Sequence, residues 1–460
     1  MRRVLAAAAA ATLVLAIGVS ASAAPPVPVS PIVPAVPGTS QVSPNVTHLG
    51  TIPIEGVGVS MRLVRVGKQL RAFVSGAAGL SIYDATDPKA PLLLGHLPFY
   101  NWENEAIAVS ADGKTAFLTE FDGFLYLHVV DVSEPSLPHI VGTLSPGGAH
   151  TVECADQPCH YLFGSEGQTY DVHDRAHPVE LPAAQEWGAL VGQKNGGHNL
   201  HRDAAGVWIS DTSPLVVFRL HPDPLHLLVL TTGDITKNTQ YQHNNIRPRA
   251  DRYAPRPATA GLGGPLRDGE LLLGEGETNF EPQCTGSNGA FSTWSMVGFD
   301  RGVQMKQLDT LRPVTNKAFT ADPAVNALGC SGHWFSQRDA RDGSILVAAG
   351  WYEHGTRFLS VNPRTGAIRQ VGYFQPNRGS TSASYWMPGS NVVWSVDYHS
   401  GIDILTFDES PLKVPTAQAI ETSWLSKLTV DPFSEAVRQL CRAGVKATSE
   451  QHARLHALTP

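Results

Sequence analysis

The sequence lacks the short motifs of several large enzyme classes. It contains no Gly-x-Ser-x-Gly nucleophile elbow, no phosphate-binding loop and no dinucleotide-binding fingerprint. Its five cysteines include no Cys-x-x-Cys pair, so neither a zinc ribbon nor a thioredoxin-like redox motif is indicated. These absences disfavour serine hydrolases and nucleotide-dependent enzymes.

Charge is also scarce, and basic charge in particular. Only 16% of the residues are charged, the formal net charge is −7, and the lysines and arginines form no block. Nucleic acids and anionic membrane surfaces attract clustered basic residues. We therefore expect no nucleic-acid partner.

One long apolar run is present, and it lies at the N-terminus. Arg2 and Arg3 precede the apolar residues 4–19, and a small-residue cleavage pattern follows at residues 21–23. This order is typical of a secretory signal peptide, here residues 1–23. No other segment is apolar and long enough to span a membrane. We expect a secreted or cell-surface protein.

The five cysteines suit that compartment, because exported proteins commonly form disulfides. Cys154 and Cys159 lie close enough to clip one hairpin, and Cys284 is free to pair with Cys330. Cys441 is then left over, either free or intermolecular. Other pairings are compatible with the sequence alone.

Composition divides the mature chain into three parts. Residues 24–44 carry seven prolines and are expected to form an extended linker without a helix or a central strand. Residues 45–411 consist of short apolar, β-branched runs separated by turns, which predicts an all-β domain. Residues 412–460 have a partly helical apolar spacing and are expected to form a short appendage or tail.

The all-β part is repetitive. The run at residues 79–88, GLSIYDATDP, returns at residues 127–135 as LHVVDVSEP, and Asp84 and Asp131 are 47 residues apart. Gly95 and Gly142, in the strands that follow, are separated by the same 47 residues. A period of 40–50 residues is typical of β-propeller blades.

These copies resemble the LVIVD-repeat family, which is named for an aliphatic strand that ends in aspartate. The resemblance implies a β-propeller and says little about activity, because one fold hosts many functions. Counting first strands gives seven blades, which start near Val59, Glu105, His150, His198, His243, His333 and Ser384. The last blade shows three strands, and residues 48–52 are expected to complete it and close the ring.

Histidines recur in phase with the repeat. Steps of 45, 48 and 45 residues lead from Glu105 to His150, His198 and His243, and His333 follows 90 residues later. Each residue is predicted to begin the innermost strand of a blade. Residues at that position lie at one mouth of the central channel, so these five should gather there.

Acidic residues are predicted to lie at the same mouth, because the second strand of each blade ends where the first begins. They are Glu120, Asp122, Glu166, Asp211, Glu275, Glu277, Glu353 and Asp397. Imidazoles held by carboxylates are typical of a transition-metal site. We expect His150, His198, His243 and His333 as ligands of a divalent metal, with zinc, copper, iron and manganese not distinguished.

Two functions are compatible with this pattern. In the first, the protein is a metal-dependent oxidoreductase, lyase or hydrolase acting on a small molecule, with Glu105 as a ligand or the catalytic general base. In the second, it is a non-catalytic extracellular module that binds a protein or polymer, and the histidines only hold neighbouring blades together. A monomer is expected in either case.

Overall fold

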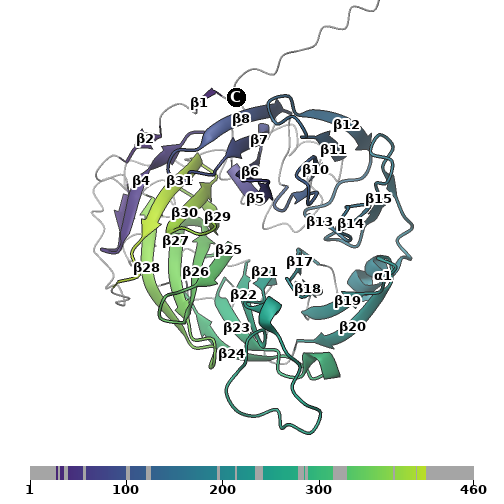
Figure 1. Ribbon diagram of the computed structural model, residues 1–460, viewed down its shortest axis with the longest axis vertical. Coiled ribbons are helices and arrows are strands. Elements are labelled where there is room, and N and C mark those ends of the chain that lie inside the picture. Colours follow the sequence, from purple (N-terminus) through teal and green to yellow (C-terminus); the bar gives the residue numbers. More distant parts are fainter. Residues whose placement is uncertain are drawn as a thin grey trace, which may run out of the picture.

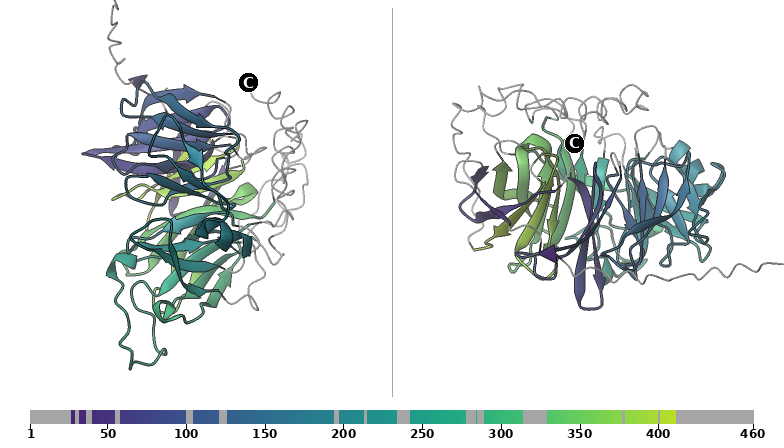
Figure 2. Two further views of the ribbon diagram at one scale, coloured as in Figure 1. Left: turned by 90° about the vertical axis from the view of Figure 1, so that its right-hand side faces the viewer. Right: turned by 90° about the horizontal axis from the view of Figure 1, so that it is seen from above.

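The computed structural model is a β-propeller. It describes residues 27–28, 32–35, 40–54, 58–99, 104–120, 126–193, 197–212, 215–233, 242–277, 284, 289–313, 329–376, 379–399 and 401–410. The sheets are arranged radially around a central axis (Figure 1), and together they form a flattened disc (Figure 2). One α-helix, α1 (Glu186–Gln193), occurs among the described residues.

Five sheets are separate blades, each an antiparallel run of consecutive strands. The first contains β5 (Gly58–Val66), β6 (Gln69–Gly76), β7 (Gly79–Asp84) and β8 (Leu92–Pro98). The second contains β9 (Ala108–Val109), β10 (Thr115–Thr119), β11 (Leu127–Asp131) and β12 (His139–Leu144). The third contains β13 (Val152–Cys154), β14 (Tyr161–Gly164), β15 (Thr169–Asp171) and β16 (Val179–Glu180).

The next two blades follow the same pattern. The fourth contains β17 (Leu200–Arg202), β18 (Val207–Ser210), β19 (Val216–Leu220) and β20 (Leu227–Thr232). The fifth contains β21 (Gln242–Ile246), β22 (Leu271–Gly276), β23 (Phe291–Ser295) and β24 (Lys306–Leu311). Short 3₁₀ turns follow several strands, among them η1 (Ala250–Arg252), η2 (Phe299–Arg301) and η4 (Tyr352–His354).

The remaining strands form a single ten-stranded sheet, which corrects the prediction of seven separate blades. Its two halves are β25 (Gly332–Asp339), β26 (Ile345–Trp351), β27 (Gly355–Val361) and β28 (Ile368–Pro376), then β29 (Thr381–Trp386), β30 (Val392–Asp397) and β31 (Gly401–Phe407). A parallel bridge between Trp334 and Ala383 joins the halves. The innermost strands approach closely enough there to pair, so the predicted blades from His333 and Ser384 are fused.

The N-terminal part of the described chain closes the ring. The segment predicted at residues 48–52 lies in β4 (Val46–Ile52), which pairs antiparallel with β31. The proline-rich segment before it is more than a linker. It adds three short strands, β1 (Val27–Pro28), β2 (Val33–Pro34) and β3 (Ser40–Val42), to the outer edges of β8, β4 and β28. Proline is tolerated at such edges because one side of an edge strand needs no N–H donor.

The repeated glycines and aspartates have local structural reasons. A Cβ atom on Gly95 would lie 2.1 Å from the carbonyl oxygen of Pro135, in the next blade. The same addition to Gly142 would meet the carbonyl oxygen of Arg175 at 2.1 Å. The carboxylate of Asp131 accepts a hydrogen bond from the backbone N–H of Ser133, at the turn that follows the strand. The sequence period therefore records blade-to-blade packing and turn formation.

Apolar clusters fill the spaces between adjacent blades. One cluster joins Leu273 and Phe291 of the fifth blade to Val347 of the ten-stranded sheet, all fully buried. Trp351 is also fully buried in this cluster, and its indole N–H donates to the carbonyl oxygen of Gly289. Packing of this kind fixes the positions of the inner strands that carry the candidate site.

Both predicted disulfides are present. Cys154 is bonded to Cys159, and Cys284 is bonded to Cys330. The predicted signal peptide, the predicted tail at 412–460 and Cys441 lie outside the described residues. Within the described part of the chain, no helix has the length and apolar character needed to cross a membrane.

Candidate metal centre

The five residues predicted to line one channel mouth lie together. Glu105 comes three residues before β9, and His150 and His198 each come two residues before their strands, β13 and β17. His243 and His333 lie at the second positions of β21 and β25. All five side chains are buried, with at most 8% of each residue exposed.

The carboxylate of Glu105 is the centre of the cluster. Its Oε1 atom lies 2.8 Å from His333 Nε2. Its Oε2 atom lies 2.8 Å from His243 Nε2 and 3.1 Å from His150 Nε2. His198 Nε2 is 3.9 Å from the same oxygen. Four imidazoles thus face one carboxylate with the nitrogen that most often binds metals.

The imidazoles form an arc rather than a single ring of ligands. Successive ring centroids are 4.4 Å apart for His150 and His198, 4.2 Å for His198 and His243, and 4.0 Å for His243 and His333. This order follows the chain, because each histidine comes from the next inner strand. Neighbouring rings are in contact. Among the described residues, no set of metal donors within 4.8 Å of one another contains both His150 and His333, the two ends of the arc.

Three sets of donor atoms in the cluster can hold a metal ion, and each combines two histidines with one glutamate. They are Glu105 with His243 and His333, Glu105 with His150 and His198, and Glu277 with His198 and His243. Donors in a set lie within 4.8 Å of one another. Among the described residues, no such set contains three of the histidines, so carboxylates are needed to complete the ligand sets.

The tautomer of His333 is fixed by its second nitrogen. His333 Nδ1 lies 2.8 Å from the backbone carbonyl oxygen of Ser382, which can only accept, so this nitrogen carries the hydrogen. A neutral His333 then directs the lone pair of Nε2 at a carboxylate oxygen of Glu105. Two lone pairs 2.8 Å apart repel each other unless a proton or a cation lies between them. The geometry therefore calls for positive charge at this point.

The pKa values of the cluster are consistent with positive charge beside Glu105. Burial tends to raise the pKa of Glu105, but the attraction of His333, His150 and His243 outweighs it and lowers the pKa well below its usual value. Burial lowers the pKa of His243, and it lowers that of His198 further, assisted by the neighbouring imidazoles. Burial also lowers the pKa of His333, but the attraction of Glu105 and their hydrogen bond outweigh it and raise this pKa above its usual value, so a proton on His333 is one source of the positive charge. Glu105 is thus ionised beside the neutral rings of His198 and His243, which suit metal binding.

Glu277 is a second carboxylate of the cluster. The hydroxyl of Tyr352 donates a 2.8 Å hydrogen bond to Glu277 Oε1, and Glu277 Oε2 lies 3.6 Å from His198 Nε2. Tyr352 is fully buried, and its ring packs on His333 with centroids 4.7 Å apart. One oxygen of Glu277 is therefore held in place while the other faces the imidazoles.

Of the other acids predicted at this mouth, Glu166 accepts a hydrogen bond from the backbone N–H of His150, and Glu275 packs against Gly332, beside His333. Glu120, Glu353 and Asp397 are also buried, and Asp122 lies outside the described residues. Glu275 is fully buried, and neither of its carboxylate oxygens has a hydrogen-bond partner among the described residues. Burial raises the pKa of Glu275 well above its usual value. Burial likewise raises the pKa of Asp211 and of Glu166. Glu105 thus differs from these acids, because the imidazoles keep it ionised.

Two supporting residues were missed by the sequence analysis. Ser382 orients His333, and Tyr352 orients Glu277. Ser382 lies on the inner strand of the last predicted blade, where the histidine series is interrupted. No local motif marks either residue, because each acts on a side chain from a different part of the chain.

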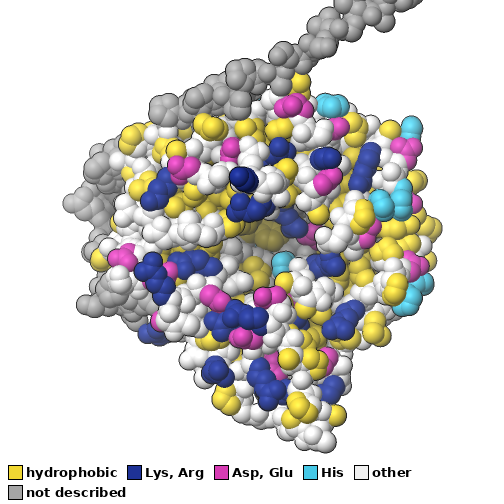
Figure 3. Space-filling model, viewed as in Figure 1, with side chains coloured by type: hydrophobic (Ala, Val, Ile, Leu, Met, Phe, Trp, Pro, Cys, Tyr) yellow, Lys and Arg dark blue, Asp and Glu magenta, His cyan; other side chains and the backbone are white. Residues whose placement is uncertain are grey.

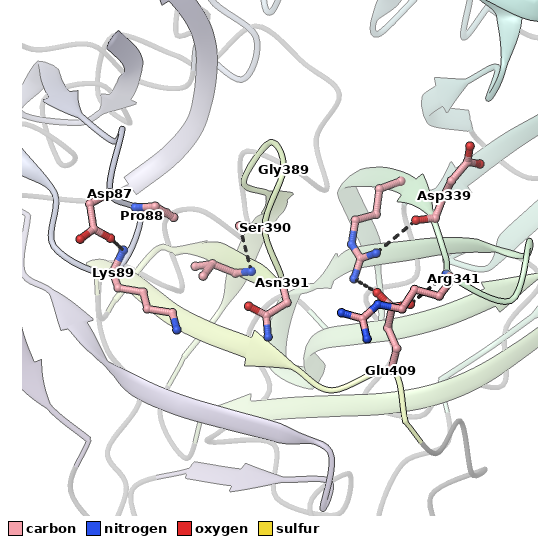
Figure 4. Close-up of a pocket in the computed structure, with 11 residues that line it drawn as sticks. Asp87, Pro88, Lys89, Asp339, Arg341, Gly389, Ser390, Asn391 and Glu409 are labelled. Carbon is pink, nitrogen blue, oxygen red and sulfur yellow. Dashed lines mark hydrogen bonds and ion pairs between the residues drawn. The ribbon is translucent and has the colours of Figure 1, made fainter. Parts of the chain in front are cut away.

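A groove with charged walls lies at the opposite end of the inner strands from the histidine cluster. A groove of about 830 Å³ is lined by Asp87, Pro88, Lys89, Arg338, Asp339, Arg341, Gly389, Ser390, Asn391, Val392 and Glu409 (Figure 4). Arg338 pairs with Glu409 at 2.6 Å, and Asp339 pairs with Arg249 at 2.8 Å. On the face seen in Figure 3, lysine and arginine side chains are spread around a central hollow together with acidic ones. The charges in this groove therefore largely neutralise one another.

Comparison with known proteins identifies no family. No protein-family model matches the sequence, and no curated protein is significantly similar. Among solved structures, the β-propeller domain of Myceliophteria thermophila Cps50 (Swd1) matches with 12% identity and a TM-score of 0.49, over 79% of this chain and 100% of that one.

Two further structures match at a similar level. A putative 6-phosphogluconolactonase from Bacteroides uniformis has 13% identity and a TM-score of 0.47, over 75% of this chain and 92% of that one. The WD40 β-propeller domain of Doa1 has 8% identity and a TM-score of 0.45, over 80% and 98%. Function must therefore be argued from the site.

Proposed function

We propose that this protein is an extracytoplasmic metalloenzyme with a divalent transition metal bound at one end of the propeller axis. The observation that carries the proposal is the buried carboxylate of Glu105, which faces four imidazole Nε2 atoms at 2.8–3.9 Å. A buried charge is costly unless it is paired or binds a metal.

The ligand chemistry favours a redox role. Glu105, His243 and His333 supply two imidazoles and one carboxylate, a combination found in non-haem Fe(II) oxygenases, where the remaining positions bind dioxygen and substrate. Around such an ion, the carbonyl oxygen of Ser382 would accept the hydrogen of His333 Nδ1 and hold the ring, which leaves Nε2 as the metal-binding nitrogen. Iron is therefore the metal we favour over zinc, copper and manganese, and a metal-dependent oxidoreductase is the reaction class we favour over a lyase or hydrolase.

The compartment and the repeat family are part of the proposal. Two disulfides in the described part of the chain support an oxidising environment, because such bonds are rare in the cytosol. We therefore propose that the chain is exported by its N-terminal signal. The aspartate-ended third strands and the glycines of the fourth strands support membership of the LVIVD-repeat family.

The proposal is tested by loading the mature protein anaerobically with Fe(II), removing unbound ions and measuring iron by elemental analysis. We expect at least one equivalent in the wild type and a loss of more than about tenfold in Glu105→Gln, since this change removes the carboxylate that faces all four rings. Glu409→Gln, at the opposite end of the propeller, is the matched control and should keep the full iron content.

Nitric oxide provides a second test as a probe for an open coordination position. We expect the Fe(II)-loaded wild type to give the EPR signal of an iron–nitrosyl adduct, and Glu105→Gln to give none. The wild type can also be loaded separately with zinc, copper and manganese. A wild type that retains none of these metals and no iron would contradict a metal function. In that case the charged groove of Figure 4 becomes the leading site, and the protein is better described as a binding module.

A further inference from the structure

We propose that the cluster binds two metal ions and that the carboxylate of Glu105 bridges them. The first ion is the one bound by His243 and His333. The second ion is bound by His150 and His198. This inference rests on the proposed metal function and extends it, because a bridged pair of ions supports chemistry that one ion does not.

The arrangement of the donors favours two ions over one. The set formed by Glu105 with His243 and His333 and the set formed by Glu105 with His150 and His198 share only the glutamate. Two nitrogens bound to the same ion lie at most about 4.2 Å apart, because each bond is about 2.0–2.1 Å long. Among the described residues, no set of donors within 4.8 Å of one another includes both His150 and His333. A single ion could not reach both ends of the arc.

The two carboxylate oxygens of Glu105 suit a bridging role. Oε1 faces His333, whereas Oε2 faces His150 at 3.1 Å and His198 at 3.9 Å. Each oxygen can therefore bind a different ion. His243, which also lies 2.8 Å from Oε2, stands between the two halves of the arc and contacts His333 on one side and His198 on the other.

Glu277 supplies negative charge beside the second ion. Its Oε1 atom is held by the hydroxyl of Tyr352, and its Oε2 atom is 3.6 Å from His198 Nε2. A second divalent ion adds two positive charges to a buried site, and a second carboxylate nearby offsets part of them. Tyr352 thus acts as a positioning residue that directs one oxygen of Glu277 towards the second ion.

Two neighbouring ions can act on the same small ligand. In known two-metal sites the ions are about 3.5–4 Å apart and bind both oxygen atoms that take part in the reaction. A bridged pair in this cluster would bind water or dioxygen between the ions. The ligand of the second site is therefore a small oxygen species, and both ions would bind the same molecule.

Metal counting distinguishes this inference from the proposed function. After anaerobic loading with Fe(II), we expect two equivalents of iron per chain in the wild type and about one in the His150→Ala/His198→Ala double variant. His128→Ala, a histidine that contacts Thr143 on the outer part of its blade, should retain two. One equivalent in the wild type overturns the second site and leaves the proposed function standing, whereas none overturns both.

Two further measurements do not depend on the folding of the double variant. Wild-type protein loaded with Mn(II) should give a spin-coupled EPR signal of an ion pair, and an uncoupled signal would overturn the proposal. Glu277→Gln should weaken binding of the second equivalent by about tenfold and leave the first unchanged. Equal affinity for both equivalents in Glu277→Gln and wild type would exclude Glu277 from the site.

Discussion

The two ends of strand β25 carry charged groups under opposite conditions. At its start, His333 faces Glu105, and both residues are at most 1% exposed. At its end, Asp339 pairs with Arg249 and Arg252, and the side chains of Asp339 and Arg252 are more than 40% exposed. Both ends are polar. Only at the first end is the ionised group, the carboxylate of Glu105, buried away from water.

The kind of cation also differs between the ends. Arginine is permanently charged, so the pairs of Asp339 with Arg249 and Arg252 are complete without any further group. Imidazole can give up its proton and bind a metal ion with the same nitrogen. The buried end is therefore able to exchange protons for metal ions, and the exposed end contributes solubility and a modest stabilisation.

The largest loss of stability from replacing one pair of residues is expected for a disulfide. Cys284–Cys330 precedes β25 at the end with the metal centre and closes a separation of 46 residues. Cys154–Cys159 clips the far end of β13 across a separation of 5 residues. Loss of loop-closure entropy predicts that replacing the first pair by alanine lowers the free energy of unfolding by about 4 kcal/mol, and replacing the second by about 2 kcal/mol. Urea denaturation of both double variants measures this, and equal losses would contradict the ranking.

The two ends should also differ in how far metal binding raises the free energy of unfolding. Addition of Fe(II) at 100 times its dissociation constant should raise the free energy of unfolding of wild type by about 2.7 kcal/mol per site, because only the folded state binds the ion. Glu105→Gln should lose this increase, and Glu409→Gln should keep it. Thermal unfolding with and without a chelator gives the comparison. A metal-induced increase that persists in Glu105→Gln would place the ion elsewhere.

The smallest effect is expected from pH at the exposed end. Burial alone would raise the pKa of Asp339, but hydrogen bonds and attraction from Arg249 and Arg252 lower it below the usual value. Its contribution to stability is therefore present above about pH 3.9 and is lost as pH falls through the pKa of the folded state. Because the pair is exposed, the contribution is no more than about 1 kcal/mol.

Asp339→Asn tests this prediction. Its unfolding free energy should be lower than that of wild type at pH 6 and should approach the wild-type value as the pH falls below about 4. Chemical denaturation across this range measures the difference. A gap between the two proteins that does not narrow with acidification would show that Asp339 stabilises the fold by packing rather than by charge.

The sequence predicted much of this arrangement because propeller blades repeat their local chemistry. Gly95 and Gly142 are glycines because the next blade's backbone leaves no room for a Cβ atom, so their spacing reveals the blade period. The prediction of seven separate blades was wrong, because the pairing of Trp334 with Ala383 across two inner strands is a tertiary contact. The prolines at residues 27–34 suggested a linker, yet edge strands accept them.

The sequence by itself determined the all-β class and the five residues of the cluster, because a fixed period places equivalent residues at the same radius and height. The disulfide pairing was one of several that the sequence allowed, and the structure decided it. Only the tertiary structure decided how those residues face one another. It placed Glu105 between the imidazoles, spread the histidines into an arc, and brought Tyr352 and Ser382 to hold Glu277 and His333. Period fixes position along a strand, whereas side-chain direction depends on packing between blades far apart in the chain.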